Sequence, residues 1–164
     1  MADWPDAVNR VAADATAKGL KIRVVETATS ARSAEEAAKA VGATVGQIVK
    51  SLVFKGATSG RPYLLLVSGS NRVDEAAMAE HLGEAVTRPD AAFVREATGF
   101  AIGGVSPFGG TKAIDVFMDV DLLLYATVWA AAGTPTHVFE VVPLQLRSAT
   151  GARIGRVDGR KDEV

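Results

Sequence analysis

The sequence predicts an α+β domain with a mixed, strongly curved β-sheet. Helical patterns are interspersed in the earlier part of the chain, whereas strand-like runs group in its C-terminal half. This order does not follow a regular βαβ alternation, which favours an α+β arrangement. A length of 164 residues suits one domain with a substantial core. We expect that single domain to span residues 1–150.

Five segments combine a helical spacing of apolar residues with start or stop signals. In the first, Pro5 suits the first helical turn, and apolar residues recur at helical spacing until Gly19. Ser33 and Glu36 have the spacing of a capping box, and the pair Thr44 and Gln47 repeats it for a single turn. The predicted helices span residues 5–19, 33–42, 74–83, 90–99 and 143–151.

Seven runs are typical of strands, because their side chains alternate in polarity or because they are short and apolar. The run "YLLLVS" is apolar enough to lie centrally in a sheet. The remaining residues, 151–164, are charged and have little to bury, so we expect a frayed tail there. The predicted strands span residues 21–26, 47–54, 63–68, 84–88, 113–119, 125–131 and 136–142.

The composition excludes several classes of protein. Without cysteine, the chain forms no disulfide, thiol nucleophile or cysteine-ligated metal site. His81 and His137 stand alone, with no partner at a metal-ligand spacing, so we expect no metal and no other cofactor. A net charge of −1 restricts any contact with RNA to a local patch and gives no reason to expect DNA binding.

The chain is expected to be cytoplasmic and to bind no membrane. No run approaches the about 18 consecutive apolar residues of a membrane span. The first ten residues, "MADWPDAVNR", lack the apolar core of a secretory signal.

Lys50 is out of place in the strand-like run "QIVKSLVF". Strand alternation puts Lys50 on one face with Ile48, Leu52 and Phe54, and puts Ser51 on the other face between two valines. Both faces are largely apolar, and a lysine is rarely buried unless its charge is paired. Lys50 therefore either serves a binding site or extends its ammonium past the strand edge to solvent.

A second unusual stretch is the loop "TGFAIGGVSPFGG", residues 98–110, which holds five glycines and one proline. Glycines allow a ligand to approach the backbone closely, and such a loop can direct several N–H groups inward, as an oxyanion hole needs. The alternative is a tight connection into the next strand. The spacing matches neither the dinucleotide fingerprint nor the P-loop, so a phosphate-binding loop is not supported.

These two stretches, in this order, resemble the YbaK/prolyl-tRNA synthetase-associated domain family. The segments that carry the resemblance are "SAEEAAKAVGATVGQIVKSLVF", "LLLVSGSNRVD", "REATGFAIGGVSPFG" and "AAGTPTHVFEVVPLQL". Together they run from about Ala28 to Leu146. The most specific features are Lys50 in its apolar strand and the G-x-x-x-P loop from Gly103 to Pro107.

The resemblance implies a free-standing aminoacyl-tRNA editing domain that acts in trans as a proofreading factor. Its implied activity is hydrolysis of the ester in mischarged tRNA, chiefly tRNA for proline carrying a smaller amino acid. The implied partners are the acceptor end and terminal adenosine of that tRNA and, transiently, prolyl-tRNA synthetase. The implied fold is a barrel-like sheet with helices packed around it. A module of the same fold that binds aminoacyl-tRNA or a synthetase without hydrolysis is the alternative.

Given this implied activity, the residue chemistry suggests roles for individual residues. Lys50 would hold the phosphate of the terminal adenosine or orient the acyl ester, and the backbone of Gly103 and Gly104 would polarise the ester carbonyl. Arg72 would contact a tRNA phosphate or cap the neighbouring helix. A functional histidine near this strand in some family members makes His137 a candidate against the alternative of a satisfied core residue. The other candidate substrate contacts are Ile48, Ser51, Leu52, Phe100, Ile102, Val105, Pro107, Thr98 and Ser106. For Thr98 and Ser106 the alternative is that their hydroxyls cap turns.

Overall fold

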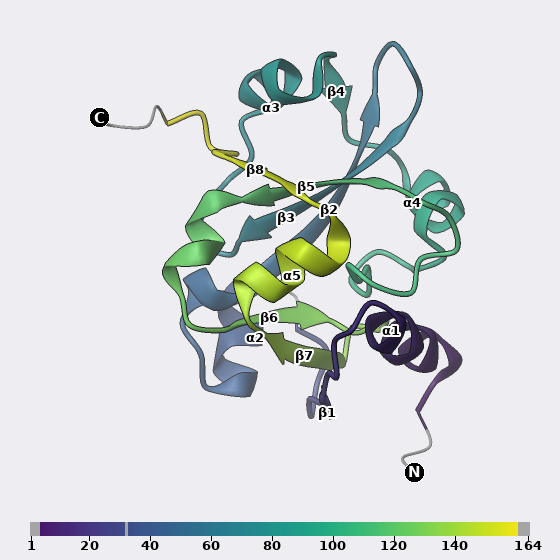
Figure 1. Ribbon diagram of the computed structural model, residues 1–164, viewed down its shortest axis with the longest axis vertical. Helices are drawn as coiled ribbons and strands as arrows, with labels where there is room; N and C mark the ends of the chain where they lie inside the picture. Colours follow the sequence, from purple (N-terminus) through teal and green to yellow (C-terminus); the bar gives the residue numbers. More distant parts are fainter. Residues whose placement is uncertain (1–3, 32, 161–164) are drawn as a thin grey trace.

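The computed structural model describes residues 4–31 and 33–160, and within them all five predicted helices are confirmed (Figure 1). Their starts follow the local capping signals: the side chains of Ser33, Asp74 and Asp90 accept backbone N–H groups three residues on, at 2.9 to 3.2 Å. The helices are α1 (Asp6–Ala17), α2 (Ala34–Val41), α3 (Glu75–Leu82), α4 (Ala91–Thr98) and α5 (Pro143–Thr150), with 3₁₀ turns η1 (Val45–Gln47) and η2 (Val120–Leu124).

The strands of the described residues form two sheets. A three-stranded antiparallel sheet has the order β1-β7-β6, and a five-stranded sheet has the order β4-β2-β3-β5-β8. The second sheet is mixed, as predicted, because β5 pairs parallel to both β3 and β8. The strands are β1 (Val24–Glu26), β2 (Val49–Gly56), β3 (Pro62–Ser68), β4 (Val86–Thr87), β5 (Asp115–Asp119), β6 (Val128–Ala131), β7 (His137–Val141) and β8 (Arg153–Gly155).

The expected barrel-like closure is not confirmed. Across the described residues, the two sheets are linked by one parallel bridge, between Ile48 and Trp129, rather than by a continuous ladder. Strand β2 pairs with β3 along its length but with β4 only at Lys55 and Gly56. The sheets therefore leave part of the β2 edge unpaired, where a closed barrel would cover it.

The prediction of a frayed tail from residue 151 is wrong for the segment that follows α5. Strand β8 pairs with β5, opposite Phe117 to Asp119, and Val157 is fully buried. This three-residue strand forms because it pairs with β5, which lies more than thirty residues earlier in the chain. The local sequence around β8 therefore does not predict a strand. The last residues of the predicted tail, 161–164, lie outside the described part of the chain.

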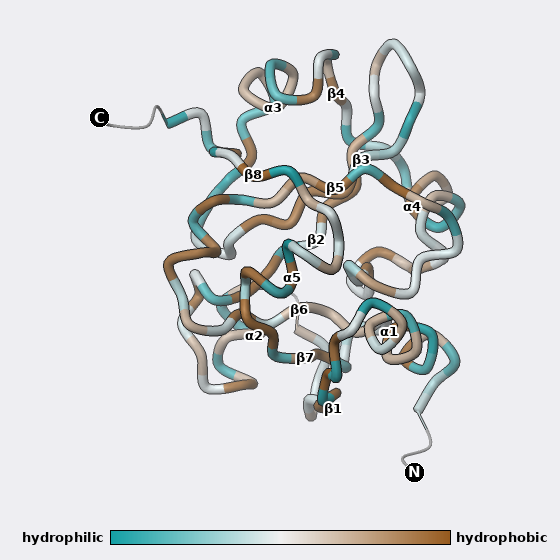
Figure 2. The backbone as a smooth tube through the Cα atoms, in the orientation of Figure 1, coloured by the Kyte–Doolittle hydropathy of each residue, from teal (hydrophilic) through white to brown (hydrophobic). Residues whose placement is uncertain are grey.

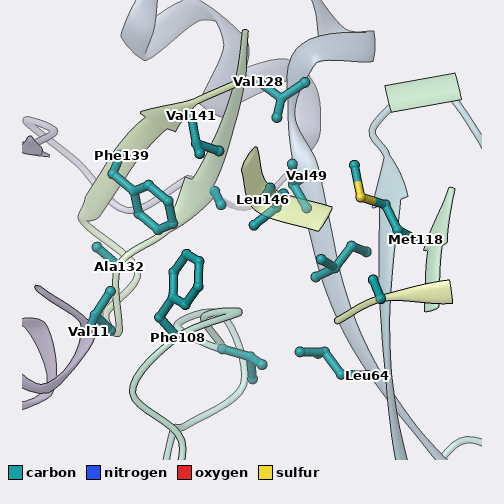
Figure 3. Packing of buried hydrophobic residues seen from close by; sticks show 14 of the residues in the cluster. Val11, Val49, Leu64, Phe108, Met118, Val128, Ala132, Phe139, Val141 and Leu146 are labelled. Carbon is teal, nitrogen blue, oxygen red and sulfur yellow. The ribbon is translucent and has the colours of Figure 1, made fainter. Parts of the chain in front are cut away.

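The main core lies between the two sheets. Strand residues Val49, Leu66 and Phe139 meet Leu146 of α5 and Val11 of α1 there, and Figure 3 shows several of these side chains converging. A second cluster covers the opposite face of β2 and β3, which are apolar along most of their length (Figure 2). Both faces of β2 are thus covered, as its sequence predicts. None of the helices in the described residues is long and apolar enough to span a bilayer.

Candidate active site

A pocket of about 480 Å³ lies along the part of β2 that β4 leaves free. Its walls come from both sheets, from one face of α2 and from the glycine loop. They include every residue from Ile48 to Phe54, together with Ala37, Val94, Ile102, Gly103, Val105, Trp129, Ala131, Thr134 and Pro135. The volume is in the range of a small-ligand site.

The register of β2 explains why this edge offers backbone groups to the pocket. Gly69 donates its N–H to the Ile48 carbonyl at 2.7 Å, and Gly56 donates to Arg61 at 2.9 Å. In an antiparallel pair the hydrogen-bonding direction alternates, so the backbone groups of Lys50, Leu52 and Phe54 also point to β3. Those of Ser51 point the other way, toward the free edge and the pocket.

Lys50 lines this pocket and is half-buried, with its Nζ donating to the backbone carbonyl of Asn71. Burial lowers the pKa of the Lys50 ammonium, and the nearby Arg72 lowers that pKa further. Asp119 and Glu35 act in the opposite direction. The ammonium therefore has a defined partner in the protein, the Asn71 carbonyl.

The glycine loop also reaches this pocket. Gly104 donates its N–H to the Ala101 carbonyl at 3.0 Å, which closes a turn whose third residue, Gly103, has φ +95°. Glycine is favoured there because other residues rarely adopt a positive φ. The N–H of Gly104 is thus occupied within the turn. Gly103 and Val105 line the pocket, and their N–H groups donate to no other described residue.

Five of the predicted substrate contacts line the pocket, namely Ile48, Ser51, Leu52, Ile102 and Val105. Their exposure differs. Ile48 and Val105 are buried in the wall, whereas Ile102 is 61% exposed and forms part of the rim. The Ser51 hydroxyl is buried without a hydrogen-bond partner among the described residues. These residues and Lys50 are brought together as the sequence suggested.

Four predicted contacts lie elsewhere. Thr98 caps the end of α4, because its hydroxyl donates to the Val94 carbonyl at 2.7 Å and accepts the Phe100 N–H at 3.1 Å. Phe100 is buried in the main core. Ser106 and Pro107 line a separate cavity beside α1, and the Ser106 hydroxyl accepts the Phe108 N–H at 3.2 Å. Their hydrogen bonds and packing stabilise the loop.

His137 and Arg72 flank the pocket without lining it. His137 is buried, with Nε2 3.3 Å from the Glu26 carboxylate and Nδ1 hydrogen-bonded to the Thr134 hydroxyl. Thr134 does line the pocket, so His137 contacts the site through that side chain. Arg72 is exposed on the loop after β3, close enough to Lys50 to affect its pKa.

Several pocket residues were not among the sequence predictions. Long-range packing brings three further parts of the chain to β2, namely one face of α2, Trp129 and the turn Thr134–Pro135. The one available signal was the turn sequence "GTPTH", which precedes a strand and carries two hydroxyls. Within the described residues, no three His, Asp or Glu side chains come together in a group that could hold a metal ion.

Comparison with known proteins identifies the family. The aminoacyl-tRNA editing domain matches residues 28–149, which include β2, the glycine loop and every wall of the pocket except Thr27. The chain belongs to the aminoacyl-tRNA editing domain family. The α+β architecture and mixed sheet described above are therefore those of an editing domain.

The relatives of this editing domain span nearly the same length. A solved structure of a candidate trans-editing enzyme for prolyl-tRNA synthetase is 43% identical, with a TM-score of 0.90, and covers 96% of this chain and 100% of its own. The uncharacterised protein YwhH of Bacillus subtilis is 30% identical over 80% of this chain and 83% of its own. A candidate Cys-tRNA(Pro)/Cys-tRNA(Cys) deacylase, EbsC of Enterococcus faecalis, is 26% identical over 76% of each chain.

Proposed function

We propose that this editing domain is an aminoacyl-tRNA deacylase that hydrolyses the ester of mischarged tRNA in trans. The observation that carries the proposal is that Lys50, Gly103 and Val105 line one largely apolar pocket, with the Lys50 ammonium held by the Asn71 carbonyl and no acceptor among the described residues for the N–H groups of Gly103 and Val105. Membership of the editing family supports it, as does the likeness to a candidate trans-editing enzyme. The site would act in the cytoplasm, where charged tRNA is used.

The chemistry required is modest, because an ester is more easily cleaved than a peptide. Water attacks the ester carbonyl carbon, the bond to the ribose oxygen breaks, and that oxygen takes up a proton, which yields free amino acid and tRNA. The N–H groups of Gly103 and Val105 would stabilise the carbonyl oxygen as its charge develops. Lys50 would hold the phosphate of the terminal adenosine or orient the ester. The substrate itself would assist, through the ribose hydroxyl adjacent to the ester.

The substrate we propose is tRNA for proline that carries a small amino acid, with prolyl-tRNA synthetase as a transient partner. The name of one relative refers to a prolyl-tRNA synthetase, and that of another refers to cysteinyl esters of two tRNAs. The apolar pocket suits a small acyl group, and Arg72 beside Lys50 suits a backbone phosphate.

Deacylation assays test this function directly. Purified protein is incubated with tRNA for proline carrying alanine, serine, cysteine, threonine or proline, without added metal and in the presence of a chelator. We expect hydrolysis of at least one non-cognate ester, unaffected by the chelator, with the prolyl ester spared. Tight binding of these tRNAs without turnover would instead support a non-catalytic module, and activity that needs zinc would contradict a metal-free site.

Pocket size should set the choice of acyl group. Val105 is buried in the pocket wall, so Val105→Ala should enlarge the pocket. The ratio of kcat/KM for the larger threonyl ester to kcat/KM for the alanyl ester should rise by about tenfold, because an apolar pocket discriminates by about this factor between substrates that differ by one methylene group. Leu144→Ala is the matched control, because its side chain is 60% exposed and lies outside the pocket. Equal shifts of this ratio in both variants, or none in either, would contradict selection by size.

A further inference from the structure

The Lys50 ammonium is held by the loop that follows β3. Lys50 lies opposite Val67 in the β2–β3 ladder, and its Nζ donates to the backbone carbonyl of Asn71. Asn71 itself donates its N–H to the Ser68 carbonyl at 2.9 Å, which closes a tight turn at the end of β3. The position of the ammonium therefore depends on where this turn holds the Asn71 carbonyl.

Two carboxylates fix the Asn71 side chain. Its Nδ2 donates to Asp119 at 2.9 Å and to Asp121 at 2.8 Å, so both protons of the amide are used. Asp119 is 1% exposed and also accepts the N–H groups of Ser68, at 3.0 Å, and Asp121, at 3.0 Å. The end of β5 is thus tied to the turn after β3 by buried, charge-assisted hydrogen bonds.

The C-terminal segment supports the same carboxylates. The parallel pairing of β8 with β5 brings the residues that follow it alongside Asp121. Arg156 donates to Asp121 at 3.2 Å, and Arg160 makes a second ion pair with it. This segment lies beyond residue 149, where the match to the editing family ends.

We propose that Asn71, clamped by Asp119 and Asp121, is a positioning residue that fixes the Lys50 ammonium at the pocket, with the C-terminal segment supporting the clamp. Its role in turnover rests on the proposed deacylase function, whereas the clamp itself does not. A side chain that must meet a phosphate or ester needs its charge held within a fraction of an ångström, and a displacement of about 1 Å can lower a rate by 10²-fold.

The charges that face Lys50 give this proposal a distinctive pH signature. Burial, Arg72 and Arg88 lower the pKa of the ammonium, whereas Asp119 and Glu35 raise it. Asp119→Asn removes a negative charge, so the pKa of Lys50 should fall further. If hydrolysis requires the ammonium, activity is lost as pH rises through that pKa, and the alkaline limb of kcat/KM should move to lower pH in this variant.

The first experiment compares the pH dependence of deacylation in the wild type, Asn71→Ala and Asp119→Asn. Both variants should lower kcat/KM by about tenfold to 10²-fold and move the alkaline limb to lower pH. Asp119→Asn does so by removing a negative charge, and Asn71→Ala by displacing the carbonyl that accepts from the ammonium. Asp115→Asn is the matched control, because Asp115 lies in the same strand with its side chain 52% exposed. Asp115→Asn should change neither kcat/KM nor the pH of the alkaline limb. If Asp119→Asn does not fold, Asn71→Ala alone decides, with its melting temperature recorded to exclude unfolding.

The second experiment follows Lys50 without any substrate. The side-chain resonances of Lys50 in the full chain are assigned by their absence from Lys50→Met and titrated by NMR. The pKa should be lower in Asp119→Asn and Asn71→Ala than in the wild type, and unchanged in Asp115→Asn. Such shifts in a protein that hydrolyses no ester would support the clamp while refuting the deacylase. A wild-type pKa and wild-type kcat/KM in both clamp variants would overturn the proposal.

Discussion

Lys50→Ala is expected to lower kcat/KM for ester hydrolysis by about 10²-fold while the domain remains folded. The ammonium is the only side-chain cation of the β2 segment that lines the pocket, and its loss removes the group proposed to orient the substrate. The fold should persist because Lys50 is only half-buried and its partner, the Asn71 carbonyl, can hydrogen-bond to water that enters the space.

The measurement is single-turnover deacylation of the best ester, with circular dichroism melting curves for each variant. Lys55→Ala is the matched control, since Lys55 lies in the same strand but is exposed, with its Nζ over the Phe93 ring. Lys50→Met, which keeps the length of the side chain, separates the charge from the packing. A folded Lys50→Ala variant with unchanged turnover would assign this lysine a structural role.

Gly104→Ala should lower kcat/KM for ester hydrolysis nearly as much as Lys50→Ala. The cause would be displacement of the backbone, because Gly104 has no side chain to lose. A Cβ at this position would lie 2.7 Å from the Gly133 carbonyl oxygen and 2.9 Å from the Thr134 Cα. Both neighbours are backbone atoms, so the turn that carries the Gly103 N–H has to move away. Overpacking of this kind destabilises a domain by about 1–3 kcal/mol, and a turn displaced by about 1 Å should lower kcat/KM by about 10²-fold.

Urea unfolding and deacylation kinetics on the same preparation check this expectation. Gly110→Ala is the control within the same loop, because its Cβ would meet nothing closer than 3.6 Å and its φ is not positive. Wild-type activity in Gly104→Ala would show that the close approach of this loop to the turn at Thr134 is not needed for catalysis.

The arrangement of the two sheets accounts for the location of the site. Had the strands closed into a barrel, the free edge of β2 would be paired and its backbone groups used in the sheet. Instead the sheets meet at the bridge between Ile48 and Trp129, and the pocket lies next to this bridge, along the free edge of β2. The glycine loop can reach this edge because Gly104 permits contact with the backbone of Gly133.

Local signals were sufficient for the helices and most strands. Ser33, Asp74 and Asp90 cap their helices through bonds to residues three positions on, and such bonds depend only on nearby sequence. The unusual place of Lys50 in an apolar strand was likewise visible in the sequence, because burying a lysine requires a partner. The partner itself could not be named, since it is a backbone carbonyl from a later turn.

Contacts between distant segments determined the features that the local sequence did not predict. Strand β8 exists because β5 offers it an edge, and the Asn71 clamp joins residues separated by 48 and 50 positions. Thr98, Phe100 and Ser106 share a loop with Gly103, yet their side chains turn into the protein, whereas those of Ile102 and Val105 line the pocket. A sequence pattern shows which residue types a loop contains, but the packing of the two sheets and α1 against that loop determines which of them line the pocket.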